Sequence, residues 1–229
     1  MKRSRKISIT VVIFLLLFSA VAYGDTWTPN KRLTWNAGNS DNPTIAVNGS
    51  NIYVVWEDFT PGNFEIYFKK SDDGGTTWTT SKSLTNNADW SRYPAIVVDG
   101  LNVYVAWADT PPGNYEIYFK KSADGGATWT TNKRLSWNAG SSIYPAIAVD
   151  GPNIYVAWAD STPGEVELNY EIYFKKSADG GATWTPTKRL TWIAGDSSQP
   201  AIAVDGPNIY VAWIDATPGN FEIYFKKSV

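Results

Sequence analysis

The chain has 229 residues, of which 43% are hydrophobic and 15% aromatic, enough for one large domain or two small ones with a sizeable core. It contains no cysteine and no histidine, which excludes a disulfide framework and argues against zinc chemistry and histidine-based catalysis. Without residues 1–24, which carry four basic residues and no acidic ones, the net charge is −6, which argues against nucleic acid or anionic lipid as a partner.

The first segment has the pattern of a cleaved signal peptide. Residues 1–6 (MKRSRK) are basic, residues 7–21 are apolar, and the small residues Ala20, Ala22 and Gly24 offer cleavage sites. The apolar run is short for a membrane-spanning helix, which needs about 20 residues, so cleavage is favoured over a retained anchor. We therefore predict a signal peptide over residues 1–24, one domain over residues 25–229, and a secreted or cell-surface protein that does not contact the membrane after cleavage.

The rest of the chain is an internal repeat. The tryptophans at 56, 107, 158 and 213 are 51, 51 and 55 residues apart, and the prolines at 43, 94, 145 and 200 keep the same intervals. The four extra residues fall within 164–169, where one loop is longer. The predicted units are about 41–91, 92–142 and 143–197, with a last unit formed by 198–229 plus 25–40.

Each unit contains four short runs of alternating or apolar residues separated by turn signals. In the second unit these runs are residues 94–98, 103–108, 115–121 and 130–137, and the last is the most polar. No stretch after the signal segment has a helical period. The sequence therefore predicts an all-β fold of four-stranded antiparallel units.

A turn motif, Ser-x-Asp-x-Gly-x-Thr-Trp, follows the third strand of three units. It resembles the Asp-box, or BNR, repeat of sialidase-like β-propellers, and three copies at regular spacing make the resemblance specific. The resemblance implies that each box locks a blade hairpin, on the face away from any ligand. The expected structural residues are Ser71, Asp73, Gly75, Trp78, Ser122, Asp124, Gly126, Trp129, Ser177, Asp179, Gly181 and Trp184.

The strand count favours a four-bladed β-propeller. The last unit supplies only three strands, and residues 31–38 form a lone fourth strand at the start, so this N-terminal strand could complete the last blade and close the ring. Closure within one chain would remove exposed strand edges and favours a monomer. The alternative is an open set of blades that completes a larger ring only by oligomerising.

The resemblance also implies that a set of recurring polar and aromatic residues shares the face opposite the Asp-boxes. An aspartate follows each second strand, an asparagine precedes the third strand, and a tryptophan ends most fourth strands, a combination typical of sugar-binding surfaces or of a cation site built from carboxylates. The candidate ligand-binding residues are Asp58, Asp109, Asp160, Asp215, Asn114, Asn220, Trp35, Trp137 and Trp192. The competing interpretation is structural: the aspartates form turns, the glutamates of the third strands mark a solvated face, and the paired lysines are solvated edge charges.

The resemblance also raises the hypothesis of an enzyme, because sialidases use three arginines, a Tyr–Glu pair and an acid/base Asp. Arg92, in Ser91-Arg92-Tyr93-Pro94, resembles one arginine motif of that family. We align it with Asn42, Tyr144 and Gln199 of the other units, so it has no counterpart there. The remaining mature arginines, Arg32, Arg134 and Arg189, are equivalent to one another on outer strands and cannot converge with Arg92.

The sequence therefore favours a secreted, non-catalytic sialidase-like propeller that serves as a binding or interaction module, most plausibly for glycans. It predicts no catalytic residue beyond the weak candidate Arg92, no cofactor and no metal. The partners expected are glycans or cell-surface proteins. The alternatives are an exo-sialidase-type glycoside hydrolase centred on Arg92 and a structural cell-surface adhesion repeat.

Overall fold

The computed structural model describes residues 26–110, 113–161, 169–192, 195–217 and 219–228. The chain divides into two units, Met1–Arg32 and Leu33–Val229, and every strand lies in the second. The predicted signal peptide and the long-loop insertion at 165–168 fall outside the described residues. No helix within the described residues is long and apolar enough to cross a membrane.

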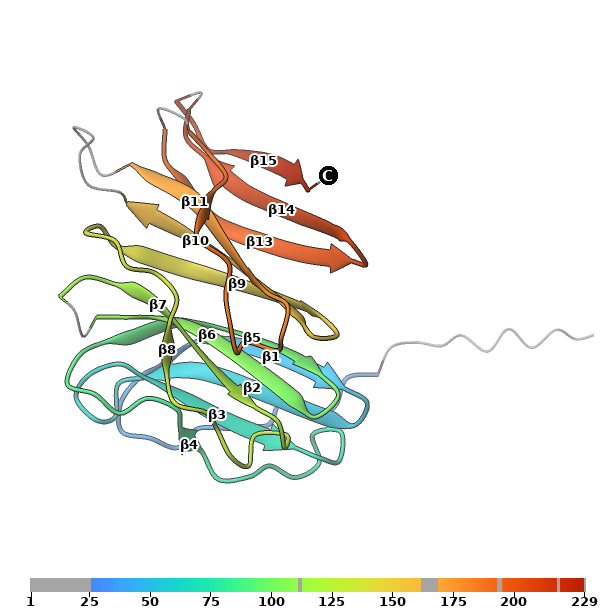
Figure 1. The fold of residues 1–229 in the computed structure, drawn as a ribbon. Helices are drawn as coiled ribbons and strands as arrows, with labels where there is room; N and C mark the ends of the chain where they lie inside the picture. Colours follow the sequence, from blue (N-terminus) through green and yellow to red (C-terminus); the bar gives the residue numbers. More distant parts are fainter. Residues whose placement is uncertain (1–25, 111–112, 162–168, 193–194, 218, 229) are drawn as a thin grey trace, which may run out of the picture. The chain divides into compact units, whose positions relative to one another are not determined.

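The second unit consists of four antiparallel sheets that follow one another in chain order (Figure 1). In each sheet the strands pair in sequence order, as the repeat predicts. The first sheet has β1 (Ser40–Asn48), β2 (Asn51–Asp58), β3 (Glu65–Ser71) and β4 (Lys82–Ser83). The second has β5 (Ser91–Asp99), β6 (Asn102–Asp109), β7 (Glu116–Ser122) and β8 (Lys133–Arg134). The third has β9 (Ser142–Asp150), β10 (Asn153–Ser161), β11 (Tyr170–Ser177) and β12 (Lys188–Arg189).

The last sheet has three strands, β13 (Ser197–Asp205), β14 (Asn208–Asp215) and β15 (Glu222–Lys227). Among the described strands β15 pairs with β14 alone, and residues 31–38 belong to none of the four sheets. The all-β architecture and the four-stranded blades are therefore confirmed, whereas the closed ring of four blades stays a prediction. The fourth strands are also shorter than the sequence predicts, with two paired residues each.

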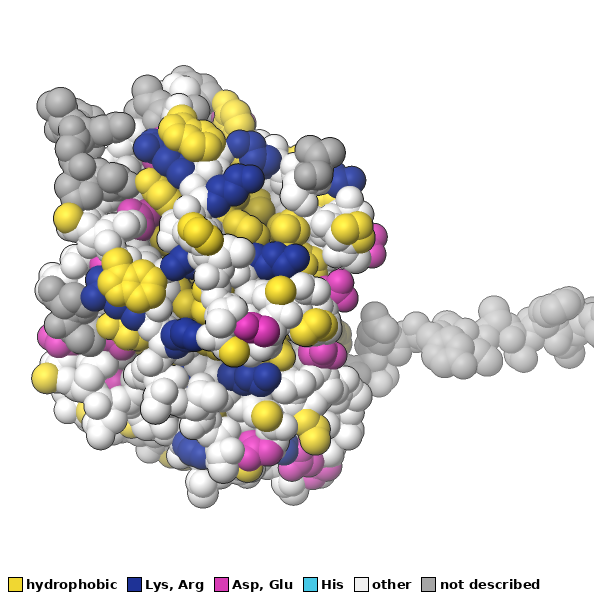
Figure 2. All heavy atoms as spheres, in the orientation of Figure 1, with side chains coloured by type: hydrophobic (Ala, Val, Ile, Leu, Met, Phe, Trp, Pro, Cys, Tyr) yellow, Lys and Arg dark blue, Asp and Glu magenta, His cyan; other side chains and the backbone are white. Residues whose placement is uncertain are grey.

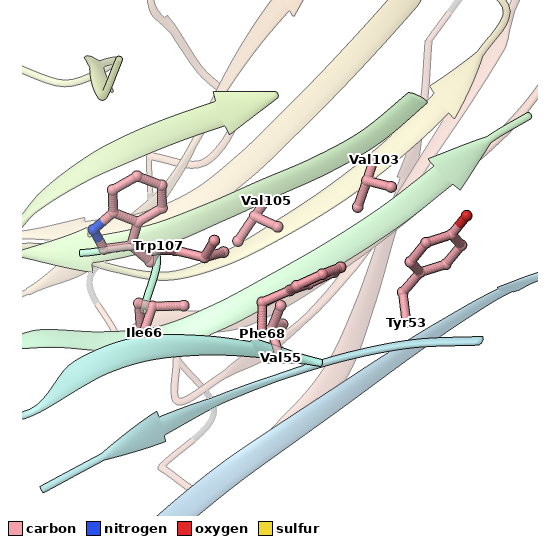
Figure 3. Packing of buried hydrophobic residues seen from close by; sticks show 8 residues of the cluster. Tyr53, Val55, Ile66, Phe68, Val103, Val105 and Trp107 are labelled. Atoms are coloured by element: carbon pink, nitrogen blue, oxygen red, sulfur yellow. The ribbon is translucent and has the colours of Figure 1, made fainter. Parts of the chain in front are cut away.

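The hydrophobic core lies between neighbouring sheets. Figure 3 shows the first of these interfaces, in which side chains of β2 and β3 meet those of β6. The pattern of alternation explains it, because residues two apart on a strand point to the same face and only that face meets the next sheet. The buried residues of this interface are Tyr53, Val55, Ile66, Phe68, Leu84, Val103, Val105 and Trp107. Equivalent clusters join the second sheet to the third and the third to the fourth.

In the first three sheets, the glutamates of the third strands and two of the lysines do not lie where the competing interpretation placed them. Lys69 and Lys175 are buried, and Lys175 Nζ donates a hydrogen bond to the Leu135 carbonyl of the preceding sheet at 2.6 Å. Burial lowers the pKa of Lys175. The glutamates Glu65, Glu116 and Glu171 are also buried. The solvated-face interpretation is therefore wrong for these residues, whereas the fourth sheet exposes all of Glu222–Lys227, as that interpretation expects.

Candidate functional site

The Asp-box hairpins are locks, as the sequence predicts. In the second sheet the Asp124 carboxylate accepts hydrogen bonds from the Ser122 hydroxyl at 2.7 Å and from the Thr128 N–H at 2.8 Å. The Trp129 indole donates to the Gly126 carbonyl at 3.0 Å. These bonds depress the carboxyl pKa of each box, to about 2 for Asp73 and Asp179, mainly through the threonine hydroxyl. The carboxylate is fully used by its own hairpin, which supports the structural role.

The four candidate aspartates at the ends of the second strands are buried. Each accepts a hydrogen bond from the indole of the tryptophan two residues earlier, at 3.0 to 3.2 Å. Burial raises the pKa of Asp109 and of Asp160. Burial also acts on Asp58, but hydrogen bonds led by Thr60 bring its pKa below the ordinary value. A ligand role for Asp58, Asp109, Asp160 and Asp215 stays a prediction, and their geometry favours holding the loops of this face.

The candidate asparagines also bond within the protein. Asn114 Nδ2 donates to Glu116 at 3.3 Å and to the Asn138 carbonyl at 3.2 Å, while Asn220 donates to Glu222 at 2.5 Å. Asn114 therefore ties the loop before the third strand to the loop that leads into the next sheet. Ligand contact by either residue stays a prediction.

The three candidate tryptophans are exposed, as is Asn220 of the predicted set. Trp35, Trp137 and Trp192 are 67%, 62% and 66% exposed, and each has a lysine ammonium over its ring. The closest is Lys175 Nζ, 4.7 Å from the Trp137 ring centroid. Figure 2 shows exposed hydrophobic side chains beside Lys and Arg side chains on this view of the molecule. The lysine holds one edge of the indole and leaves a broad part of its surface to solvent.

A cavity lies where the four innermost strands begin. It has a volume of about 480 Å³ and is lined by Asn42, Pro43, Thr44, Tyr93, Pro94, Tyr144, Gln199 and Pro200. It therefore takes the same X-Pro position from all four repeats, with two phenols and two carboxamides at X. The rings of Tyr93 and Tyr144 are 4.6 Å apart between centroids. Burial raises the pKa of Tyr93 to about 12, so its hydroxyl keeps its proton at neutral pH.

The backbone at these four X residues is left-handed. Asn42, Tyr93, Tyr144 and Gln199 have φ angles of 48°, 56°, 52° and 50°, and each lies in an irregularity of the strand pairing. A side chain at positive φ costs about 1 kcal/mol or more, and a following proline adds further restriction. Strain of this kind is concentrated at functional sites. Its recurrence in all four repeats places four side chains around one cavity.

Arg92 lies beside this cavity and is neutralised. Its Nη2 is 2.8 Å and its Nε 3.2 Å from Glu57 Oε1, across the interface between the first two sheets. Glu57 is fully buried and also accepts hydrogen bonds from the Tyr93 N–H at 2.9 Å and from Asn42 Nδ2 at 2.7 Å. The guanidinium lies 4.4 Å from the Phe64 ring centroid. Arg92 is therefore engaged in a buried ion pair.

The strand register corrects the sequence alignment at this point by one residue. Tyr93, not Arg92, is equivalent to Asn42, Tyr144 and Gln199, and the residues equivalent to Arg92 are Asp41, Ile143 and Ser198. The conclusion that Arg92 is unique still holds. Sequence reasoning missed Glu57, although one signal was available: the other repeats have Ala108, Ala159 and Ile214 at its position.

The described part of the chain contains no group of three or more acidic residues arranged to hold a metal ion. Four-stranded antiparallel blades locked by Asp-box hairpins, with innermost strands around a shared cavity, define the sialidase-like β-propeller fold.

Comparisons with solved structures agree with this fold. The chain is similar to an α-L-arabinofuranosidase of Fusarium graminearum, with a TM-score of 0.62, 18% identity, and coverage of 78% of this chain and 59% of that one. It is also similar to the sialidase of Trypanosoma rangeli, with a TM-score of 0.60, 16% identity, and coverage of 82% and 36%. These neighbours are six-bladed β-propellers. No protein-family model matches the chain, and a search of curated proteins gave no match.

The likeness is one of fold, because all the identities quoted are below 20%. The chain spans about three fifths of the arabinofuranosidase and about a third of the sialidase.

Proposed function

We propose that this chain is a carbohydrate-binding propeller that acts outside the cytoplasm and binds without catalysis. The observation that carries the proposal is the cavity at the start of the four innermost strands, lined by Asn42, Tyr93, Tyr144 and Gln199. Two phenols and two carboxamides offer aromatic faces for the C–H groups of a sugar and both donors and acceptors for its hydroxyls. Export is supported by the basic and apolar pattern of residues 1–24.

The exposed tryptophans support a second level of binding. Trp35, Trp137 and Trp192 repeat one position of the blade, so a branched or polymeric glycan could contact more than one of them. Each contact would be weak by itself. Linked contacts raise the overall affinity through effective concentration, which suits a polymer displayed on a surface.

The state of Arg92 is the reason for proposing binding rather than hydrolysis. An arginine that recognises a substrate carboxylate must offer its guanidinium to the ligand, whereas Arg92 is paired with the buried Glu57 at 2.8 Å. A ligand carboxylate would have to compete with an anion already held in place. We therefore expect neutral sugars to bind better than acidic ones.

A glycan array with the mature chain (residues 25–229) displayed at high valency tests the proposal. The sugar that binds is then titrated against Tyr144→Asn, which imports the residue that the first repeat carries at this strained position. We expect a loss of affinity of about tenfold or more, because a half-buried aromatic ring is removed from the cavity. Trp137→Ala is the matched rim variant and should weaken binding to polymers while leaving a monosaccharide Kd unchanged. An empty array, or an unchanged Kd for Tyr144→Asn with an unchanged melting temperature, would contradict the proposal.

A glycoside hydrolase is the second candidate, and the fold neighbours favour it. Two of them are an α-L-arabinofuranosidase in complex with arabinobiose and a sialidase in complex with sialic acid. Tyr93 lines the cavity, and its backbone N–H donates a hydrogen bond to the buried carboxylate of Glu57, so a carboxylate lies next to a cavity residue. Fluorogenic arabinofuranosides and sialosides test this candidate directly. Release of the fluorophore that is abolished by Glu57→Gln would replace the binding proposal with an enzymatic one.

The closed four-bladed ring, completed by residues 25–40, stays a prediction. The match between residues 24–35 and residues 181–192 fits a fourth strand that is supplied either by the same chain or by a second copy. The mass of the mature chain in solution distinguishes the two, because closure within one chain requires a monomer.

A further inference from the structure

The first and last sheets expose the two halves of an interface that occurs three times inside the chain. In each internal interface, the second and third strands of one sheet pack against the first two strands of the next. Among the residues that the structure describes, one half of such an interface is therefore uncovered at each end of the series. We call them the β15 face (Ile223 and Phe225) and the β1 face (Ile45 and Val47).

The β15 face is exposed although its equivalents are core. The isoleucines at this position in the first three sheets, Ile66, Ile117 and Ile172, are fully buried, while Ile223 is 75% exposed. Phe68 and Phe119 are buried, whereas Phe225 is 63% exposed. A face that buries these side chains in every internal sheet has the shape and polarity of an interface core.

The β1 face is its counterpart. Ile96 and Val98 of the second sheet pack against the core of the first interface, and Ile147 and Val149 do the same in the second. The equivalent residues in the first sheet, Ile45 and Val47, are 63% and 56% exposed. The β15 face and the β1 face therefore correspond to the two faces that pack against each other between internal sheets.

An apolar pocket lies at the position where the tryptophan of the next box in the series would pack. The box tryptophan of each sheet packs on a phenylalanine of the sheet before it: Trp129 on Phe68 at 5.2 Å and Trp184 on Phe119 at 5.1 Å. The next phenylalanine in this series, Phe174, lines a pocket of about 220 Å³ together with Leu190, Ile209 and Val211. Ser228 pairs with Ile209, as the first serine of each box pairs with the second strand: its N–H donates to the Ile209 carbonyl at 2.9 Å, and its hydroxyl accepts from the Ile209 N–H at 2.9 Å.

The N-terminal segment has the sequence that this pocket lacks. Residues 24–35, GDTWTPNKRLTW, match residues 181–192, GATWTPTKRLTW, and Trp27 takes the place of Trp184. The residues that follow already lie on the first sheet as a preceding fourth strand would: the Leu33 carbonyl accepts a hydrogen bond from Lys69 at 2.7 Å, as that of Leu84 does from Lys120 at 2.5 Å. The chain thus carries a fourth strand against its first sheet and a three-stranded last sheet that lacks one.

We propose that the β15 face and the pocket at Phe174 bind the β1 face and the N-terminal strand of a second copy of this chain. Residues 31–33 of that copy would pair with β15, its Trp27 would enter the pocket, and its Ile45 and Val47 would cover Ile223 and Phe225. Each copy would make this contact twice, once through its β15 face and once through its β1 face. Two copies joined in this way form a closed ring with two-fold symmetry, whereas a head-to-tail contact that did not close would grow into a filament.

The curvature of the blades favours a second copy over closure by the same chain. The sheets superpose on blades of six-bladed propellers. Two copies make eight blades. The rotation from one blade to the next in an eight-bladed ring is closer to the rotation in a six-bladed ring than the rotation in a four-bladed ring is. In addition, β13 contacts the third sheet and β1 contacts the second, and these contacts hold the last and first sheets within their own chain. The last sheet can therefore accept a partner without moving.

Light scattering after size-exclusion chromatography of the mature chain tests the proposal with two complementary variants. Ile223→Asp damages only the β15 face and Ile45→Asp only the β1 face. We expect the wild type to have twice the mass of one chain, and each variant alone to have half the wild-type mass. An equimolar mixture of the two variants, at high concentration, should recover the double mass, because one intact pair of faces remains between them.

Leu101→Asp is the matched control, since it places the same charge on an exposed side chain of the second sheet, which contributes to neither face. It should keep the double mass. Far-UV circular dichroism must show folded protein for every variant. A monomeric wild type would overturn the proposal in favour of closure within one chain. A dimer that survives either substitution, or a mixture that stays monomeric, would show that the two faces do not bind each other.

Discussion

The buried pair of Glu57 and Arg92 leads to the sharpest prediction about stability, because the chain contains its own control. The next interface, between the second and third sheets, has Ala108 and Ile143 at the same two positions, and both lie in its hydrophobic cluster. Arg92→Ile therefore removes one partner of the ion pair, and Glu57→Ala combined with Arg92→Ile replaces the pair by the residues that already pack at the next interface. Glu57→Ala alone completes a double-mutant cycle.

The magnitude follows from the burial of the two groups. Removing one partner of a buried pair costs about 3–5 kcal/mol, because it leaves a charge without compensation. The Glu57 side chain is fully buried but keeps two hydrogen bonds, from Tyr93 and Asn42, and Arg92 is about a quarter exposed. We therefore expect Arg92→Ile to lose about 2–3 kcal/mol, somewhat below that range. The double variant should lie within about 1 kcal/mol of the wild type, since apolar replacement of a buried pair is often neutral.

Urea unfolding of the mature chain, followed by tryptophan fluorescence and circular dichroism, measures these differences. With a slope of about 2–3 kcal/mol/M, the Arg92→Ile midpoint should fall by about 1 M. The double variant should recover most of that shift. The reasoning is refuted if Arg92→Ile unfolds at the wild-type midpoint, or if the double variant is as unstable as the single one.

Two further predictions concern the Asp-boxes. Hydrogen bonds hold the pKa of Asp73 and Asp179 at about 2, below the unfolded value of about 4, so the stabilisation by these carboxylates is present above pH 4 and is lost as the pH falls toward 2. Replacing all three box aspartates by Asn should therefore make the melting temperature less dependent on pH over this range. An unchanged slope of melting temperature against pH would contradict this prediction. Gly126→Ala should lower the free energy of unfolding in urea by about 1–3 kcal/mol more than Gly62→Ala does. Both glycines have φ near +100°, but only a Cβ at position 126 would lie 2.3 Å from the Phe68 side chain. Equal losses of stability would show that this clash does not matter.

Most of the fold was predictable from the sequence because its signals are local and repeated. Alternation within residues 103–108, the turn chemistry of Asp124 and Gly126, and the constant spacing of Trp56 and Trp107 each specify short-range structure, and the structure confirms the blades. The shortness of the fourth strands was not predictable, because a polar outer run has few partners and only two residues pair.

The site was less accessible to sequence reasoning because its contacts join different repeats. Glu57 and Arg92 are 35 positions apart and belong to neighbouring sheets, so neither residue indicates the other. The left-handed backbone at Tyr93 and Tyr144 could not be predicted either, since a residue before proline normally adopts an extended conformation. The aspartates after the second strands were predicted to bind a ligand because of their charge. In the structure each is buried and accepts a hydrogen bond from an indole, as Asp109 does from Trp107, so its carboxylate is engaged within the protein.

The overlap of each hairpin with the preceding sheet gives the series a direction. Trp129 covers Phe68 and Trp184 covers Phe119, so every sheet is capped by the one that follows it, and coupling passes between nearest neighbours as in other repeat proteins. Under a force applied to the C-terminus, the sheets would come away one at a time from that end. The lengths of chain released would be about 51 to 55 residues per step, or roughly 17–20 nm at about 3.3–3.6 Å per residue. A molecule built in this way can yield stepwise under tension while the remaining blades stay folded.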